Sequence, residues 1–201
     1  MTIAVLGTVS AIAACSSDST GPSRGTIAVK LTDAPFPLDS LSSVNVFVVR
    51  VDARTAAADS AAAAQGAGSD SAHVNGWTTL ATPNASVNLL AYQNGTTLGL
   101  GHANVATGSY QGFRLVIDPS KSNVTLKSGL VLTGSSTPNI AFPSGATAGL
   151  KIALAAPVVV TAGDTTTMVV DFNVASSFVM RGNSLSQNGL LFKPVITATV
   201  K

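Results

Sequence analysis

The sequence predicts an all-β protein, an antiparallel β-sandwich or barrel of about eight to ten strands. Apolar residues alternate with polar or small ones in short segments rich in β-branched side chains. Turn-forming pairs such as Asn94-Gly95 and Asn188-Gly189 separate these segments. Helical periodicity of any length is missing from the sequence, so the alternation is the dominant signal.

Six segments carry the clearest strand pattern, and they span residues 26–31, 44–51, 113–117, 150–154, 168–172 and 190–200. In the second segment the apolar face changes after Val48, which predicts a bulge or a strand buried on both sides. In the last segment Pro194 removes a backbone donor, which predicts an edge strand or a bulge. Together these segments predict one sandwich domain over residues 25–201.

The tract at residues 55–72 departs from this pattern. It is rich in alanine, glycine, serine and aspartate, and it has no apolar stripe that could dock a helix on a core. We therefore expect a long low-complexity loop or insertion between two strands.

Composition excludes several classes of protein. Of the 201 residues, 46% are hydrophobic and 10% are charged, and the net charge is +2. A nucleic-acid partner is not expected at so small a positive surplus, and disorder is not expected at such hydrophobicity. One cysteine and two histidines leave almost no ligands for a soft-metal site.

The N-terminal residues predict export and lipid anchoring. Residues 3–14 form an uncharged apolar run that is too short to span a bilayer but has the length of a signal-peptide core. The run ends in Ile-Ala-Ala followed by Cys15, which resembles a bacterial lipobox. We expect a signal peptide over residues 1–15, a diacylglycerol and palmitate anchor on Cys15, and a flexible tether over residues 16–24.

One alternative interpretation of this segment and one question about its start stay open. Residues 3–14 could form a buried strand or helix, with Cys15 an ordinary buried thiol. No lysine or arginine precedes the apolar run, although signal peptides normally begin with a positive charge, so we expect the natural start to lie upstream of Met1. The lipid-anchor reading places the protein in the bacterial cell envelope, at the outer membrane or the cell surface.

Several segments, in order, resemble the bacterial and archaeal family called domain of unknown function 4382. The resemblance covers roughly residues 25–200, and its most recognisable feature is Thr-Asp-Ala-Pro at residues 32–35. Other matching segments lie at residues 44–48, 77, 87–90, 108–115, 143–145, 150–151, 170–173 and 192–196. The resemblance implies a secreted or lipid-anchored β-sandwich of prealbumin or immunoglobulin type, without an established activity. Family members usually carry Asp at the position of Asn88 and often at Asn173, which weakens any charge-dependent role there.

Asp33 has two interpretations. Just after a strand and before Ala-Pro, it is expected to accept backbone hydrogen bonds and lock the turn. The alternative is a calcium site in which Asp33 and Asp39 are joined across the fold by Asp171. Only nine acidic residues are present and no EF-hand loop pattern appears, so no bound cofactor is expected, with calcium as the alternative.

Aromatic residues supply the candidate ligand-binding positions. Trp77 and Tyr92 could face a sugar or a hydrophobic partner, and aromatic anchors are enriched in binding sites. The alternative is that the single tryptophan fills the core or closes one end of the sandwich. Tyr110, just before a strand, is expected to form a hydrogen bond with a neighbouring loop, as a tyrosine corner does.

Charged strand residues are expected to have structural roles. Asp171 and Lys193 are candidates for a cross-strand ion pair, and Arg114 is a similar candidate. His73 and His102 lie in segments that read as loops. No nucleophile elbow, phosphate-binding loop or zinc-protease motif accompanies them.

The sequence therefore predicts a non-enzymatic binding or adhesion module with an unidentified protein or glycan ligand, which contacts its ligand through loops at one end of the sandwich. One alternative is a polysaccharide-binding accessory module that uses Trp77 or Tyr92. Another is a hydrolase with an unrecognised Ser/His site at His73 or His102.

Overall fold

The computed structural model describes residues 21–33, 41–55, 58, 76–127, 137–143, 148–182 and 188–201. Fourteen strands fill most of this part of the chain, joined by the single-turn helices η1 (Leu89–Tyr92) and α2 (Val174–Ser177). The strands are β1 (Arg24–Thr32), β2 (Leu41–Thr55), β3 (Trp77–Ala81), β4 (Ala85–Asn88), β5 (Leu98–Ala106), β6 (Gly108–Leu126), β7 (Ile140–Ala141), β8 (Leu150–Lys151), β9 (Ala153–Leu154), β10 (Val158–Val160), β11 (Thr165–Phe172), β12 (Phe178–Met180), β13 (Leu190–Phe192) and β14 (Ile196–Val200). The predicted all-β fold is confirmed. The strand number exceeds the prediction because several strands are only two or three residues long.

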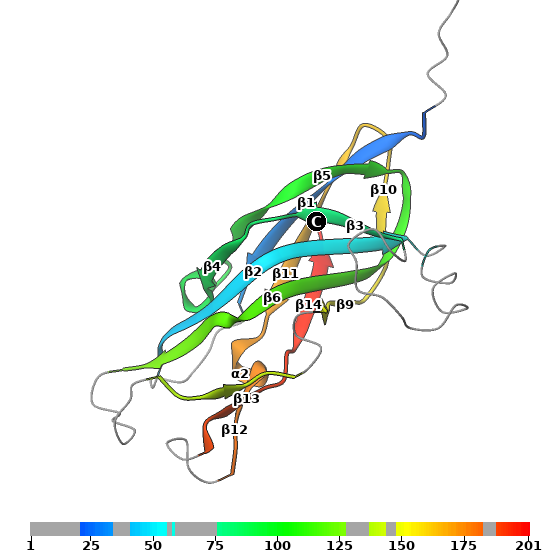
Figure 1. The fold of residues 1–201 in the computed structure, drawn as a ribbon. Helices are drawn as coiled ribbons and strands as arrows, with labels where there is room; N and C mark the ends of the chain where they lie inside the picture. The colour runs from blue at the N-terminus through cyan, green and yellow to red at the C-terminus, as the bar shows by residue number, and fades with distance from the viewer. Residues whose placement is uncertain are drawn as a thin grey trace, which may run out of the picture.

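Two sheets form a sandwich-like body (Figure 1). Sheet A has the order β5-β1-β11-β14-β9, and sheet B has the order β10-β6-β2-β3, with β4 also paired to β2 and β8 to β6. Buried side chains from both sheets join in one hydrophobic cluster. Most of the described strand pairs are antiparallel, as predicted, whereas β1 pairs with β11, and β14 with β9, in parallel.

Alternation along the strands explains the core. Ile27, Val29 and Leu31 on β1 are buried, and so are Phe113, Leu115 and Ile117 on β6. On β2 the buried apolar positions are 44, 46 and 48, then 51 and 53, and the pairing with β6 shifts register between Val48 and Arg50. The predicted bulge is therefore present, and it returns the apolar side chains to the same buried face.

A small third sheet, with the order β12-β13-β7, lies at the end of the sandwich opposite to the start of β1 (Figure 1). The ring of Phe192 on β13 lies 5.1 Å from the rings of Phe142 and Phe178 and 6.0 Å from that of Phe172, which joins this sheet to the core. Pro194 lies between β13 and β14, so the missing backbone donor falls where the chain leaves one sheet for another.

Both asparagines that depart from the family pattern accept backbone hydrogen bonds. Asn88 Oδ1 accepts from the N–H groups of Val44 and Leu90, and Asn173 Oδ1 accepts from the N–H of Ser176 at the start of α2. An amide oxygen serves this role as a carboxylate would, so the fold does not need a charge at either position.

The hydroxyl of Tyr110 on β6 donates to the carbonyl of Ala106 over 2.9 Å, so the predicted hydrogen bond is present, but its acceptor is the last residue of β5 and not a loop residue. The predicted signal peptide, Cys15, and most of the 55–72 tract lie outside the described residues. Within the described part, none of the helices has the length and hydrophobicity needed to cross a membrane.

Candidate ligand-binding site

The candidate site begins with a row of side chains across sheet B. Asp52 on β2 lies opposite Arg114 on β6 and Thr79 on β3, and Arg114 lies opposite Lys151 on β8. The neighbouring positions Val51, Ala53, Phe113 and Leu115 face the core. Because successive side chains of a strand point to opposite faces, this row lies on the outer face of sheet B.

Asp52 organises the row. Its carboxylate is fully buried, and Oδ2 accepts from Arg114 Nε over 2.9 Å and from Arg50 Nε over 3.0 Å. Oδ1 accepts from the hydroxyl of Thr79 over 2.9 Å. Charge-assisted hydrogen bonds of this length are what makes a buried carboxylate tolerable, so Asp52 and Arg114 depend on each other.

Arg114 is held from a second side as well. It is only 7% exposed, and Nη1 donates to the carbonyl of Ala148 over 3.0 Å. Gly149, at a φ of +120°, permits this approach, because a Cβ there would lie 2.6 Å from Arg114 Cδ. Nη2 is buried and meets no hydrogen-bond acceptor in the described part of the chain.

Trp77 lies in the next row, opposite Arg54 of β2. The guanidinium carbons of Arg54 and Arg114 lie 4.6 Å and 4.4 Å from the centre of its ring system. Such cation–π contacts are worth about 0.5–2 kcal/mol each. Burial, followed by the positive charge of Arg114, lowers the pKa of Arg54. The single tryptophan is therefore half-buried in a cationic cluster, and the alternative that it fills the core is wrong.

A hollow of about 480 Å³ opens beside this cluster. Arg54, Arg114, Lys151, Trp77 and Gln111 are among its lining residues, and no described residue that lines it carries a negative charge. Opposite Arg54 on β6 stands Gly112, which has no side chain to fill the space. We call this hollow the basic pocket.

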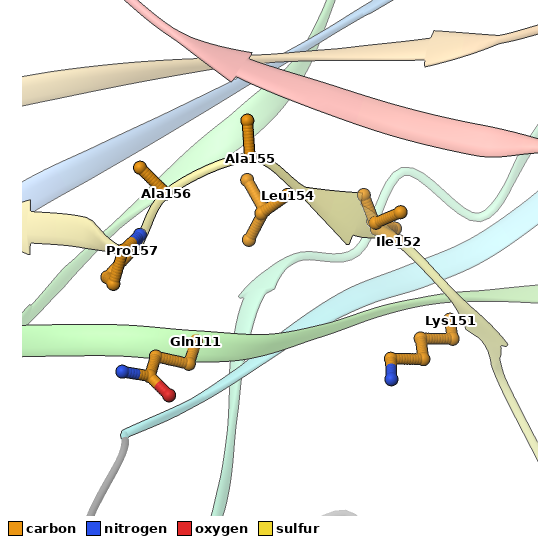
Figure 2. Close-up of a pocket in the computed structure, with 8 residues that line it drawn as sticks. Gln111, Lys151, Ile152, Leu154, Ala155, Ala156 and Pro157 are labelled. Carbon is orange, nitrogen blue, oxygen red and sulfur yellow. The ribbon is translucent and has the colours of Figure 1, made fainter.

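A second hollow, of about 470 Å³, shares Gln111 and Lys151 with the basic pocket. Figure 2 shows these two polar side chains on one side of it and the turn from Leu154 to Pro157 on the other. Alanine, leucine, isoleucine and proline side chains supply the rest of its lining. The two hollows together offer cationic and apolar surface along the β6–β8 edge.

The structure brings Asp33 and Asp171 near each other but does not assemble a metal site from the described residues. Asp171 on β11 is paired with Thr32, the neighbour of Asp33. Among the described residues, no group of three His, Cys, Asp or Glu side chains is placed to hold a metal ion. Asp39, the third predicted ligand, lies outside the described residues.

Asp33 links distant parts of the fold. Its Oδ1 accepts from the N–H of Val174 in α2 over 3.0 Å, and its Oδ2 accepts from Gln93 Nε2 over 3.1 Å. Its own N–H donates to the carbonyl of Tyr92. Burial raises the pKa of Asp33 to about 6, hydrogen bonds from Val174 and Gln93 oppose the rise, and the charge of Asp171 adds to it.

The remaining predicted residues lie elsewhere. Tyr92 in η1 packs against the core, so the structure does not bring it to Trp77 on the outer face. His102 lies on β5, exposed, and not in a loop as predicted, whereas His73 lies outside the described residues. Asp171 lies opposite Thr32 and Thr197 in sheet A, and Lys193 lies between β13 and β14, so the two residues are not directly opposite each other in the sheet.

Sequence reasoning found Trp77 and Arg114 but missed Asp52 and Arg54. The available signal was the alternation Val51-Asp52-Ala53-Arg54, in which both charges share the face opposite two core residues. Alternation does not reveal which strands lie on either side, so the partners of these charges were not predictable.

The family model described as "Domain of unknown function (DUF4382)" matches residues 24–194. No curated protein and no solved structure matches the chain.

Proposed function

The chain belongs to the DUF4382 family, and from its site we propose that it is a non-enzymatic binding module of the bacterial cell envelope, exported and anchored by a lipid on Cys15. The proposed ligand site is the basic pocket on the outer face of sheet B. This differs from the loop-end site expected from the sequence, because the convergent side chains lie on strands.

One observation carries the proposal, namely the stack of Arg54 and Arg114 on a half-exposed Trp77 beside an open hollow. Ligand sites are typically concave, with an aromatic wall and a few fixed polar groups. Arg114 is fixed by Asp52 and Ala148, so the pocket does not have to form on binding. Trp and Arg are also the residues that most often dominate binding energy.

A polysaccharide is the second candidate ligand, favoured by the position of Trp77 on a sheet face. Saturable binding to a glycan array is expected for the wild-type chain and is expected to fall at least about tenfold in Trp77→Ala, since truncating an aromatic anchor costs roughly 2 kcal/mol or more. His102→Ala, at an exposed position on β5 of sheet A, is the matched control and is expected to bind normally. Full binding by a folded Trp77→Ala protein would place the ligand elsewhere.

Turnover of an ester or glycoside probe that is lost in His102→Ala would support the hydrolase alternative.

The envelope part of the proposal depends on Cys15. The Cys15→Ala protein is expected to leave the membrane fraction and to lack the mass of the acyl chains, because the thiol is the acceptor of the lipid. Cell fractionation with intact-mass spectrometry measures both. If the variant remains in the envelope with an unchanged mass increment, the lipid-anchor reading is wrong.

A further inference from the structure

The charges of the chain are distributed unevenly between the two sheets. The strands of sheet B carry five basic residues, Arg50, Arg54, Arg114, Lys121 and Lys151, and two acidic ones, Asp52 and Asp118. The strands of sheet A carry Arg24, Lys30 and Asp171 as their only charged residues apart from histidine. Sheet B therefore holds a surplus of three positive charges, although the whole chain has a net charge of only +2.

The basic residues of sheet B follow the outer side of β2 and β6. Near one end, Lys121 Nζ lies 4.5 Å from the centre of the Phe47 ring, and Phe47 alternates with the buried Val46 and Val48. Arg54 lies seven residues further along β2, which corresponds to about 23 Å at the usual strand rise. We call the outer face from Lys121 to Arg54 and Lys151 the basic stripe.

Both acidic residues of the stripe are already engaged by its cations. The Asp52 carboxylate accepts from Arg50 and Arg114, and the Asp118 carboxylate lies 3.3 Å from Lys121 Nζ. Neither carboxylate lines the basic pocket, where Arg54, Arg114 and Lys151 converge. The three cations that converge at the basic pocket would therefore draw an anionic group.

The contacts of Trp77 favour an anionic ligand over a neutral sugar. Two guanidinium groups already lie over the ring, so a neutral sugar that stacked there would have to compete with them. Guanidinium groups offer paired donors that match carboxylate and sulfate oxygens. An anionic group beside the ring can bind these cations without displacing them from it.

We propose that the basic stripe binds an acidic polysaccharide, with a carboxylate or sulfate group seated in the basic pocket at Arg54, Arg114 and Lys151. This inference rests on the proposed binding function and adds the chemical class of the ligand. The extended shape of the stripe suits a chain with repeated charges, and the neighbouring hollow with its apolar lining offers room for an uncharged part of a sugar.

The test compares polymers of different charge on the full chain. Polygalacturonate carries carboxylates, dextran sulfate carries sulfates, dextran is neutral, and single-stranded DNA is a phosphate polyanion. We expect saturable binding to one or both acidic glycans, weakened by salt, with at most about a tenth of that affinity for dextran and DNA. Arg54→Gln and Lys151→Gln are each expected to weaken binding about five- to tenfold and to reduce its salt dependence, because each removes one charge from the pocket.

Lys30→Gln on sheet A is the matched control, since it removes a charge away from the stripe, and unfolding curves check that each variant is folded. Binding of dextran as tight as that of the acidic glycans, and lost in Trp77→Ala, would overturn the acidic class while leaving the proposed binding function intact. Binding to DNA as tight as to the acidic glycans would overturn selectivity for a polysaccharide. No binding to any of these polymers, together with a silent glycan array, would contradict both proposals.

Discussion

Replacing Asp52 by alanine is expected to lower the free energy of unfolding by about 3–5 kcal/mol, because it leaves the buried Arg114 without its carboxylate partner. Arg50 loses the same partner, and the hydroxyl of Thr79 loses its acceptor. In a chain of this length such a loss corresponds to a fall in Tm of about 10 °C. Chemical denaturation and calorimetry measure it.

Two comparisons separate charge from packing at this position. Asp118→Asn removes a more accessible carboxylate that also lies beside a cation, and it is expected to lower the free energy of unfolding much less than Asp52→Ala does. The double variant Asp52→Leu with Arg114→Met removes both charges and is expected to be more stable than Asp52→Ala alone. If Asp52→Ala unfolds within a degree or two of the wild type, the ion pair does not stabilise sheet B.

The layered β-fold was predictable because it depends on a repeating signal. Apolar side chains at every second position, as in Ile27, Val29 and Leu31, can all be buried only on one face of a strand. The bulge after Val48 was predictable for the same reason, since the apolar positions change parity there. The order and direction of the strands in each sheet were not predictable, because the alternation of apolar side chains is the same for parallel and antiparallel neighbours. The parallel pairing of β1 with β11 joins segments almost 140 residues apart, as in the register Thr26 to Thr165.

The candidate site was predictable only in part, because the partners of its residues lie on neighbouring strands. Residue type alone pointed to Trp77, since aromatic residues are enriched in binding sites, but it left open that the ring fills the core or closes one end of the sandwich. The surroundings of Trp77 depend on β2 and β6, which place Arg54 and Arg114 over its ring. Arg114 was a candidate for a cross-strand ion pair, and it forms one with Asp52, which lies opposite it on β2. Such a pairing depends on tertiary neighbours, so a single sequence does not contain it.

The stability of the protein is expected to fall as the pH rises from about 4 to about 6, because burial raises the pKa of Asp33 to about 6 from its ordinary value of 3.8. A carboxyl with a raised pKa in the folded state binds its proton more tightly there than in the unfolded chain. The unfolded state then holds fewer protons across this pH window, so the free energy of unfolding declines with pH and levels off above it. The difference of roughly two units between the pKa of Asp33 in the folded and in the unfolded state corresponds to a change of about 3 kcal/mol at most in the free energy of unfolding.

The Asp33→Asn variant isolates this contribution from those of the other carboxyl groups. The introduced amide would keep an oxygen for the N–H of Val174, and the Gln93 amide can turn to accept from the new NH₂ group. Measured as Tm at pH 4.5 and pH 7.5, the advantage of the wild type over the variant is expected to shrink or reverse at the higher pH. The contribution of Asp118 to the pH dependence of stability has the opposite sign, because its hydrogen bond from Ser120 and the nearby Lys121 lower its pKa. This contribution is the same in the wild type and in Asp33→Asn, so it does not affect the comparison.

A constant difference between wild type and Asp33→Asn across this range would contradict a raised pKa for Asp33. Excess Ca²⁺ provides a second comparison, because Asp33 and Asp171 were predicted as ligands of a calcium ion together with Asp39. A calcium ion bound there would favour the ionised carboxylates and raise the Tm of the wild type most at pH 7.5. A pH effect without a calcium effect means that Asp33 acts as a buried link between β1, η1 and α2 through the bonds to Tyr92, Gln93 and Val174. The instability of its ionised form is then the cost of holding that junction with a carboxyl group.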